Sequence, residues 1–252
     1  MEHCLIDSTA VIGQSTAIGP FSVIEDGVTI GNHCEIGTHV VIHRGSLIGD
    51  HVRIDDHTVI GKRPMRSKRS IFKDEPLNPV RIGNDCLIGA QVVIYAGSEL
   101  GEGVLVADGA AIREQVTVGE YTIVGRLVTV ENVTQIGKKC KLETGSYITA
   151  YSTVEDFCFV APMVTTTNDN FLGRTEERFK HFKGVTVRRG GRIGANATIL
   201  PGKVIEADGV VGAGAVVTRD VKEGQIVAGM PAKYFSDVPS EQLLENQGWE
   251  NE

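Results

Sequence analysis

The sequence predicts an all-β fold, a parallel β-helix of about ten triangular coils. Three observations predict it: an aliphatic residue at every sixth position, a glycine after every third aliphatic residue, and a chain poor in aromatic residues. The aliphatic series has three runs, from Ile6 to Ile60, from Ile82 to Val160 and from Val187 to Val217. Helices repeat near 3.6 residues and strands alternate at 2, so a period of six indicates hexads of one short strand and one turn, stacked as a solenoid.

Glycine marks every third hexad. In nine of ten such places the residue after the aliphatic is glycine, at Gly13, Gly31, Gly49, Gly83, Gly101, Gly119, Gly137, Gly194 and Gly212, with Glu155 as the exception. This period of eighteen predicts three hexads per coil and therefore a three-sided column. We expect thirty hexads in ten coils, about 48 Å tall at roughly 4.8 Å per strand, with one unbroken phase from Gly83 to Gly194.

Composition narrows the class of protein. The chain has 252 residues, of which 41% are hydrophobic and only 6% aromatic, which predicts an aliphatic core. A net charge of −7 disfavours non-specific binding to nucleic acid. Neither a secretion signal nor a long apolar run is found, so we expect a cytoplasmic protein without a membrane partner.

The cysteines follow the hexads. Four of the five, Cys34, Cys86, Cys140 and Cys158, fall four residues after an aliphatic residue, and Cys4 falls where an earlier hexad would place it. That position is the second inward-facing one of the hexad. We therefore expect small buried side chains rather than disulfides or a metal site.

Two interruptions and a tail complete the predicted organisation. Residues 1–235 form the β-helix domain, with loops at 61–81 and 166–186, and loops of this length in a compact repeat are usually functional. Residues 236–252 form a short helical tail, with one helix expected over Pro239–Trp249 and Ser240 as its N-cap.

The hexads, of the form aliphatic–Gly–x–x–small–x, resemble the bacterial transferase hexapeptide family. The resemblance implies a left-handed coil. The segments 193–202, 212–221 and 229–233 look like the end of small-molecule acyl-CoA transferases, although Met230 stands where asparagine is common. Thr167-Asn168-Asp169 at the start of a loop resembles N-acyltransferases that modify nucleotide-linked amino sugars. Those enzymes are trimers that bind acyl-CoA and nucleotide sugar between neighbouring prisms.

Departures from glycine predict where the site lies. One corner carries polar residues on successive coils, and the first loop leaves from it: Tyr95, Arg113 with Glu114, Glu131 and Thr149. The preceding corner carries a second column, from which we expect the second loop to leave with Asn168: Asp108, Arg126, Thr144 and Pro162. Rung-to-rung salt bridges, such as Arg113 with Glu131, explain the same residues equally well.

The resemblance implies attack of a sugar amine on an acyl thioester. We assign Asn168 to the thioester, and Asp108 and Glu131 to the amine, as catalytic residues. Since these two carboxylates are on different corners, one substrate meets both only across a subunit interface. The expected substrate-binding residues are Tyr95, Arg113, Glu114, Arg63 and Arg69. The two arginines of the first loop, Arg63 and Arg69, are expected to bind the diphosphate of the nucleotide sugar.

Acetyl-CoA or another short acyl-CoA is the expected co-substrate, with no metal. We expect it along the later coils, where small residues admit pantetheine and basic residues meet the phosphates. The residues assigned to it are Asn168, Ala195, Ala213, Gly214, Lys203 and Arg219.

Histidine usage separates the alternatives. No histidine lies between His57 and His181, so the central coils have neither the three zinc ligands of a γ-type carbonic anhydrase nor a histidine base for hydroxyl acceptors. An amine acceptor depends more on orientation than on a dedicated base, which favours N-acyl transfer. The resemblance of the Thr167-Asn168-Asp169 loop implies an amino-dideoxy sugar as the acceptor, with deoxythymidine preferred over uridine. An O-acetyltransferase and a non-catalytic scaffold remain open.

Overall fold

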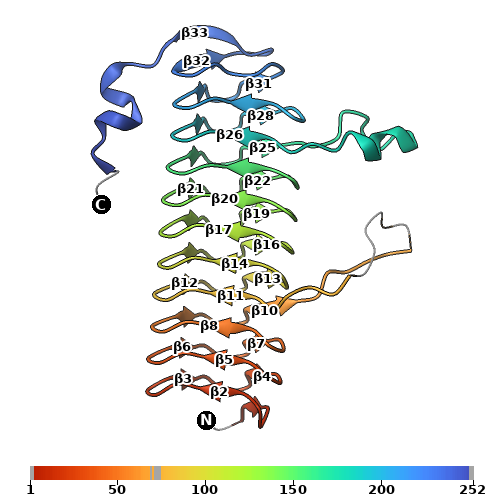
Figure 1. The fold of residues 1–252 in the computed structure, drawn as a ribbon, viewed down its shortest axis with the longest axis vertical. Helices are drawn as coiled ribbons and strands as arrows, with labels where there is room; N and C mark the ends of the chain where they lie inside the picture. The colour runs from red at the N-terminus through yellow and green to blue at the C-terminus, as the bar shows by residue number, and fades with distance from the viewer. Residues whose placement is uncertain (1–2, 69, 71–74, 250–252) are drawn as a thin grey trace.

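The protein is one long prism of stacked triangular coils. The computed structural model describes residues 3–68, 70 and 75–249. In Figure 1 the chain winds from the N-terminus at one end of the prism to the C-terminal strands at the other, and two loops project from the same side. No helix in these described ranges is long and apolar enough to cross a bilayer.

Three parallel sheets, here named A, B and C, form the sides of the prism. Sheet A contains 11 strands: β1 (Leu5–Ile6), β4 (Val23–Ile24), β7 (Val41–Ile42), β10 (Val59–Lys62), β13 (Val93–Tyr95), β16 (Ala111–Ile112), β19 (Thr129–Val130), β22 (Tyr147–Ile148), β25 (Thr165–Thr166), β28 (Thr198–Ile199) and β31 (Val216–Val217). Sheet B contains 10: β2 (Val11–Ile12), β5 (Thr29–Ile30), β8 (Leu47–Ile48), β11 (Arg81–Ile82), β14 (Glu99–Leu100), β17 (Thr117–Val118), β20 (Gln135–Ile136), β23 (Thr153–Val154), β26 (Thr186–Val187) and β29 (Val204–Ile205). Sheet C contains 12: β3 (Ala17–Ile18), β6 (Glu35–Ile36), β9 (Arg53–Ile54), β12 (Leu87–Ile88), β15 (Leu105–Val106), β18 (Ile123–Val124), β21 (Lys141–Leu142), β24 (Phe159–Val160), β27 (Arg192–Ile193), β30 (Val210–Val211), β32 (Gln225–Ala228) and the antiparallel β33 (Lys233–Asp237).

The hexad sets the register of these sheets. Each strand pairs with the strand one coil later, as when Val93 aligns with Ala111 and Ile94 with Ile112. The second residue of the strand points inward, and Ile94 and Ile112 are both fully buried. The predicted β-solenoid is therefore confirmed. Cys34, Cys86, Cys140 and Cys158 are free and buried, as predicted.

The solenoid is slightly taller than the ten coils expected. Two parallel strands, β25 and β32, lie outside the aliphatic series, and β33 adds an antiparallel strand. In β25 the inward position is Thr166, which is 1% exposed. Its hydroxyl accepts a hydrogen bond from the Thr149 N–H at 2.7 Å and donates one to the Tyr147 carbonyl at 3.1 Å. A threonine can replace the aliphatic residue here because the neighbouring coil satisfies its hydroxyl.

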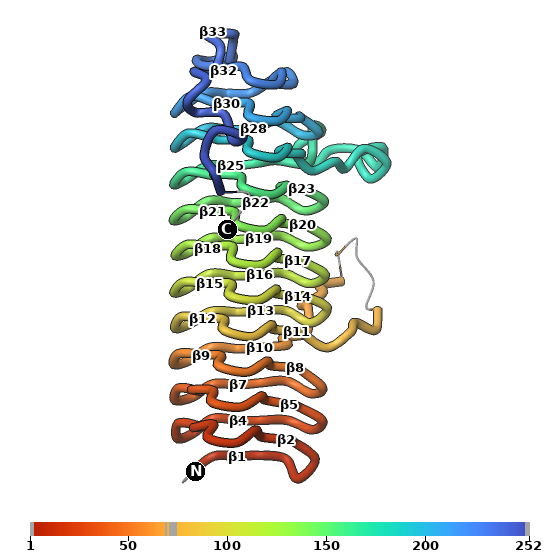
Figure 2. The backbone as a smooth tube through the Cα atoms, turned by 60° about the vertical axis from the view of Figure 1, so that its left-hand side comes forward, coloured from red at the N-terminus to blue at the C-terminus, as the bar shows by residue number. Residues whose placement is uncertain are grey.

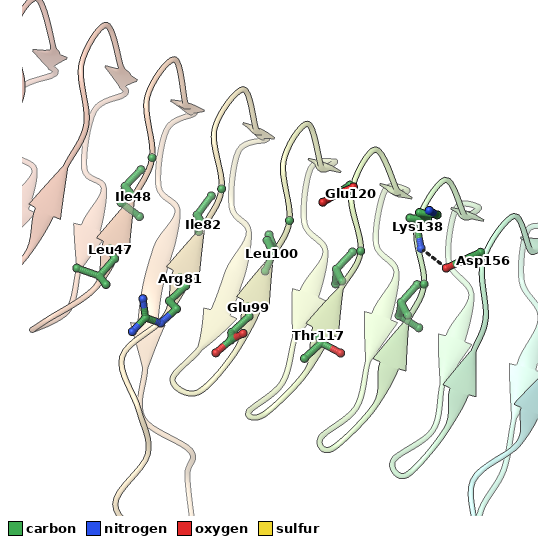
Figure 3. A pocket seen from close by; sticks show the side chains of 17 residues that line it. Leu47, Ile48, Arg81, Ile82, Glu99, Leu100, Thr117, Glu120, Lys138 and Asp156 are labelled. Atoms are coloured by element: carbon green, nitrogen blue, oxygen red, sulfur yellow. Dashed lines mark hydrogen bonds between the residues drawn. The ribbon is translucent and has the colours of Figure 1, made fainter. Parts of the chain in front are cut away.

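The glycine column lies where the chain turns from sheet B to sheet C, the B–C corner. A Cβ on Gly119 would be 2.6 Å from the Gly137 carbonyl carbon, so successive coils approach too closely there for a side chain. The close approach leaves a shallow groove of about 800 Å³ along sheet B. Figure 3 shows the side chains of Arg81, Glu99 and Thr117 that line it.

The expectation that Gly194 continues this column is wrong. Gly83 and Gly137 follow strands of sheet B, whereas Gly194 follows β27 of sheet C. The extra strand β25 lies between the second and third aliphatic runs, so each later hexad falls one side of the prism further on than the period of eighteen predicts. The prism itself stays continuous, because β23 pairs with β26 across the second loop.

Both loops leave the corner between sheets A and B, the A–B corner. The first departs after β10 and returns at β11, and the second departs after β25 and returns at β26. Figures 1 and 2 show the two loops one above the other on this edge. The second loop was expected to leave the corner between sheets C and A, the C–A corner; it leaves one side later because β25 precedes it.

The tail also differs from the expected single helix. Two 3-10 turns, η2 (Ser240–Gln242) and η3 (Leu244–Asn246), flank an extended Leu243, and the second loop contains a third, η1 (Glu176–Lys180). The tail is held against the prism because the Leu244 N–H donates to Asp208 Oδ1 at 3.0 Å and the Leu244 side chain is buried. These contacts hold Leu244 against the prism. The tail consists of short separate turns rather than one helix.

Candidate functional site

A cavity of about 460 Å³ lies between the two loops on the A–B corner; we name it the inter-loop cavity. Three parts of the chain converge on it: the corner itself, the first loop and the second loop. Its lining residues are Glu131, Asn132, Tyr147, Thr149, Ala150 and Tyr151 from the coils, Ser67 and Ser70 from the first loop, and Asn168, Asp169, Arg178 and Phe182 from the second. Two predicted catalytic residues, Glu131 and Asn168, therefore share one cavity.

Just before this cavity along the corner, a charged network joins the coils to the first loop. Glu114 is 2% exposed and receives hydrogen bonds from Arg113 Nε at 2.9 Å and from Arg66 Nη2 at 2.8 Å. Arg66 belongs to the first loop, so this buried carboxylate holds that loop against the coil. Glu114 was predicted to bind substrate, and that role stays a prediction; in the structure its carboxylate contacts Arg113 and Arg66.

Arg113 connects Glu114 to the cavity. Its Nη1 donates to Glu131 Oε2 at 3.1 Å, and its guanidinium lies 5.0 Å from the centre of the Tyr95 ring. Lys62 approaches the same ring at 5.2 Å. Tyr95, Arg113 and Glu131 are thus neighbours on successive coils, in the order that the sequence predicts.

The charges of this network favour ionised carboxylates. Burial opposes ionisation of Glu114, but the hydrogen bonds from Arg113, from its own backbone and from Arg66 outweigh it, and its pKa lies below the ordinary value of 4.5. Burial also opposes the charge of Arg113, yet its bonds to Glu114 raise the pKa of the guanidinium. In the described chain, Glu131 Oε1 has no hydrogen bond, which leaves this oxygen to a ligand.

The second loop presents an arginine to the cavity. Asp169 accepts the Phe171 N–H at 2.8 Å, the Gly173 N–H at 3.0 Å and Arg178 Nη1 at 3.0 Å. Arg178 also lies 4.7 Å from the Phe179 ring centre and 5.5 Å from that of Phe182. Burial opposes ionisation of Asp169, but these hydrogen bonds lower its pKa below the usual range. A charged, fixed guanidinium therefore lines the cavity.

Aromatic side chains form part of the cavity wall. Tyr147 and Tyr151 come from the corner and Phe182 from the second loop. Burial raises the pKa of both tyrosines, so they are neutral hydrogen-bond donors at neutral pH. Such walls suit a ring system carrying polar groups. The sequence analysis missed Arg178, Phe182 and both tyrosines.

The structure does not bring Asp108 to this cavity. Asp108 lies on the C–A corner, where Oδ1 accepts the Ala90 N–H of the preceding coil at 3.0 Å. Asp56 makes the same contact with Thr38 at 2.7 Å on the same corner. Asp108 therefore has a local structural contact, and its catalytic role stays a prediction that depends on a second subunit.

Arg63, one of the two arginines predicted to bind the diphosphate, does not line the inter-loop cavity. Arg63 is exposed and lines a different cavity below the first loop. Arg69 lies outside the described residues. Among the described residues that line the inter-loop cavity, the cation is Arg178, which belongs to the second loop.

The predicted coenzyme residues fall on two corners. Ala195, Ala213 and Gly214 follow strands of sheet C, whereas Lys203 and Arg219 lie on the A–B corner. Arg219 lines a cavity of about 470 Å³ at the C-terminal end, which we name the cap cavity, together with Lys222, Lys233 and Tyr234. Arg219 is near the corner four sheet A strands beyond Glu131 (β19, β22, β25, β28, β31), or about 19 Å at roughly 4.8 Å per strand.

Clustered metal-ligand side chains or a base at His181 would be alternatives to the chemistry of the inter-loop cavity, and the positions of these side chains in the structure bear on both. Within the described ranges, no group of three or more His, Cys, Asp or Glu side chains is arranged to hold a metal ion. His181 is exposed, pairs with Glu177 at 3.1 Å and stacks on Phe171, and it is not a lining residue of the inter-loop cavity.

Fold and repeat together define a β-solenoid built from hexapeptide repeats. The family model for "Bacterial transferase hexapeptide (six repeats)" matches residues 9–44 and 79–114, and that for "Hexapeptide repeat of succinyl-transferase" matches residues 115–150 and 185–219. Together these matches extend over more than half of the chain, which therefore belongs to the hexapeptide-repeat family.

Curated relatives match over shorter stretches. A serine acetyltransferase of Buchnera aphidicola is 34% identical over 97 residues, 38% of this chain and 33% of the relative. A 2,3,4,5-tetrahydropyridine-2,6-dicarboxylate N-acetyltransferase of Staphylococcus aureus is 50% identical over 46 residues, 18% of this chain and 19% of the relative. The chain thus spans a third or less of the length of these relatives.

Solved structures with a related fold include two acyltransferases of sugar nucleotides. The UDP-N-acetylglucosamine acyltransferase of Francisella novicida aligns with 19% identity and a TM-score of 0.47, over 98% of this chain and 73% of that one. PerB of Caulobacter crescentus, solved with CoA and GDP-perosamine, aligns with 25% identity and a TM-score of 0.37, over 64% and 57%.

Proposed function

We propose that the protein is an N-acyltransferase that moves an acetyl or short acyl group from acyl-CoA to the amine of a nucleotide-linked amino sugar, with a deoxythymidine-linked amino-dideoxy sugar as the preferred acceptor. The observation that carries the proposal is the inter-loop cavity. There Glu131 and Asn168 lie beside aromatic side chains and one arginine. The names of the two curated relatives, an acetyltransferase and an N-acetyltransferase, agree with acyl transfer.

The lining of the cavity suits the acceptor. Tyr147, Tyr151 and Phe182 offer faces for a sugar or a base, and Arg178 offers an N–H fork for a phosphate. Glu131 Oε1 can accept a hydrogen bond from the amine. A neutral amine needs to be held and oriented at the thioester, and these residues provide contacts for that purpose.

The cap cavity suits the donor. Its basic residues Arg219, Lys222 and Lys233 can meet coenzyme phosphates, and Tyr234 offers a face for adenine. The distance of about 19 Å along the A–B corner from Arg219 to Glu131 is compatible with an extended pantetheine arm reaching from this cavity to a thioester beside Glu131.

Acyl transfer from the thioester to the amine forms one bond to the acyl carbon and breaks one. The amine nitrogen attacks the thioester carbonyl carbon, the new C–N bond forms and the C–S bond breaks. The amine loses one proton, to Glu131 or to water, and the departing sulfur takes up this proton and leaves as the free thiol of CoA. Asn168 orients the thioester carbonyl. The products are an amide on the sugar and CoA.

We propose a homotrimer that works in the cytoplasm. Exposed apolar side chains support self-association: on the C–A corner, Phe21, Leu127 and Met163 are 56%, 63% and 58% exposed. Leu127 and Met163 lie two coils apart on this corner, and exposed apolar side chains that gather on one surface mark interaction sites. In such an assembly the C–A corner of one subunit, with Asp108, can approach the A–B corner of the next.

The testing experiment measures thiol release from acetyl-CoA with amino-sugar nucleotides as acceptors. We expect release that depends on the amine and stops when the amine is already acylated. Release only with hydroxyl acceptors would favour an O-acyltransferase, and no release with any acceptor would support a non-catalytic solenoid.

A further inference from the structure

A second, larger cavity of about 1330 Å³ lies on the same corner but on the N-terminal side of the first loop; we name it the lower cavity. The coils before β10 form its floor, and the two arms of the loop form its wall, with residues 62–64 on one arm and 75–79 on the other. The inter-loop cavity has no lining residue in common with it. The proposed acyl transfer does not use this space.

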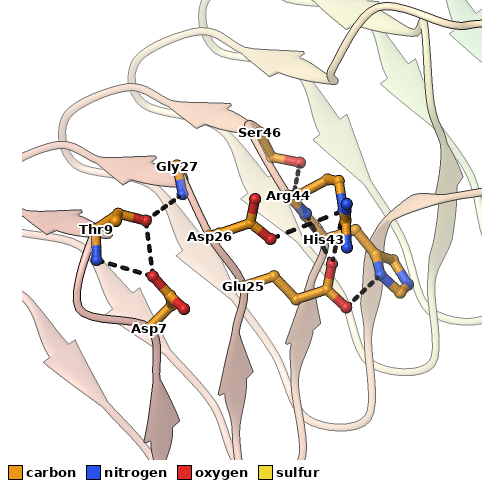
Figure 4. A network of polar contacts seen from close by, with 8 residues as sticks. All are labelled: Asp7, Thr9, Glu25, Asp26, Gly27, His43, Arg44 and Ser46. Atoms are coloured by element: carbon orange, nitrogen blue, oxygen red, sulfur yellow. Dashed lines mark hydrogen bonds and ion pairs between the residues drawn. The ribbon is translucent and has the colours of Figure 1, made fainter.

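A histidine–carboxylate pair lies on the floor of the lower cavity. His43 Nδ1 and Glu25 Oε1 are 3.1 Å apart, and Glu25 Oε2 accepts the backbone N–H of Arg44 at 3.0 Å (Figure 4). An ionised carboxylate only accepts hydrogen bonds, so Nδ1 of the imidazole carries the proton. In the neutral ring, Nε2 is then an acceptor. His43 is 31% exposed, so a ligand can reach the ring.

The backbone around this pair is closely packed. The Ser46 hydroxyl donates to the His43 carbonyl at 2.7 Å. A Cβ on Gly61 would lie 3.0 Å from the His43 Cβ and 2.8 Å from Ser46 Oγ, so glycine admits the next coil at this point. These contacts fix the direction of the imidazole before any ligand arrives.

Cations lie on the arm of the loop beside the pair. Lys62 and Arg63 both line the cavity, and neither belongs to an ion pair within the described residues. The remaining charges partly compensate one another, since Arg44 is near Glu25 and Asp26 at 3.9 and 3.7 Å. Glu75, on the returning arm, is the one further carboxylate of the lining.

We propose that the lower cavity is a second small-molecule site, for an anion that also carries a hydroxyl group, such as a sugar phosphate. The hydroxyl donates its proton to a hydrogen bond with His43 Nε2, which Glu25 orients. The anionic group binds between Lys62 and Arg63. The site is independent of the proposed acyl transfer, because none of these residues lines the inter-loop cavity.

The test is calorimetric titration of the full chain with glucose 1-phosphate and, separately, with inorganic phosphate. We expect one saturable site per chain for glucose 1-phosphate. His43→Gln and Arg63→Gln should each weaken it roughly tenfold, the loss of one charged or buried hydrogen bond. His57→Gln, an exposed histidine on another corner, is the matched control and should bind as the unmodified chain does.

Titration with inorganic phosphate distinguishes the contact of the anionic group with Arg63 from the contact of the sugar hydroxyl with His43. Arg63→Gln should weaken phosphate binding and His43→Gln should not, because phosphate has no sugar hydroxyl for Nε2. Thermal unfolding of each variant checks that it folds, and Glu25→Gln, which removes only the orienting charge, gives a second route to the same loss. Unchanged affinity for glucose 1-phosphate in His43→Gln or Arg63→Gln, or no saturable binding by the unmodified chain, overturns the proposal.

Discussion

The A–B and B–C corners are both built from hexads that pair in the same register, yet they carry different side chains. On the B–C corner, glycines such as Gly119 let successive coils touch. On the A–B corner, the equivalent places hold Tyr95, Arg113 and Glu131, and both loops leave there. The comparison shows that the repeat fixes the shape of the prism, whereas departures from the repeat place polar chemistry on one edge.

Removing the buried charge of the A–B corner should have the largest effect on stability. Glu114→Gln removes the buried carboxylate that Arg113 and Arg66 share, and we expect a loss of about 3 kcal/mol in the free energy of unfolding, measured by urea titration. The pKa of Glu114 is lowered in the fold, so its contribution is complete above the ordinary value of 4.5 and is lost as the pH falls through the lower folded value.

The pH dependence supplies a control for this variant. The stability difference between the unmodified chain and Glu114→Gln should be constant between about pH 5 and 8 and shrink below 4.5. Glu99→Gln, on the outward face of sheet B, should show little difference at any pH. A stability difference between the unmodified chain and Glu114→Gln that grew as the pH fell would contradict the assignment of Glu114 as ionised in the fold.

On the B–C corner, the close approach itself can be tested. Gly119→Ala should cost about 2 kcal/mol, because its Cβ would meet the backbone of the next coil. Gly214→Ala is the matched control: no atom lies within 4 Å of its Cβ, and only its positive φ of 66° is strained, so about 1 kcal/mol is expected. Equal losses would show that coil contact is not the reason for the glycine column.

The extra strand β25 gives a smaller effect. Thr166→Val keeps the shape of the side chain but leaves the buried Thr149 N–H without its acceptor, for an expected loss of about 1.5 kcal/mol in urea titration. Thr165→Val changes the exposed neighbour and should be nearly neutral. If both variants unfold at the same urea concentration, the hydroxyl is not what holds β25 in the sheet.

Asp108→Asn should have the smallest effect. Asparagine keeps the oxygen that accepts the Ala90 N–H, so we expect a stability change within about 0.5 kcal/mol and thiol release within about threefold of the unmodified chain. A much larger loss of activity at unchanged stability would indicate that Asp108 acts in the inter-loop cavity of a neighbouring subunit.

The sequence was sufficient for the strands and the corner of the first loop, because a buried aliphatic every six residues has one structural solution. The strand at Thr166 was not predicted, since a polar inward residue does not show in an aliphatic pattern. Because this strand was not counted, Gly194 was assigned to the wrong corner. Within the site, Glu131 and Asn168 were predicted to act and do share a cavity. Arg178 and Phe182 were missed, because the conformation of the second loop depends on hydrogen bonds that Asp169 accepts within the loop rather than on the repeat.

The most direct test of the account compares one carboxylate from each region. Thiol release from acetyl-CoA with an amino-sugar nucleotide should fall by roughly a hundredfold in Glu131→Gln, within the range for loss of a proton-handling group, and stay unchanged in Glu99→Gln on sheet B. Equal activity of the two variants, with both folded, would contradict the claim that the A–B corner between the loops is where the chemistry takes place.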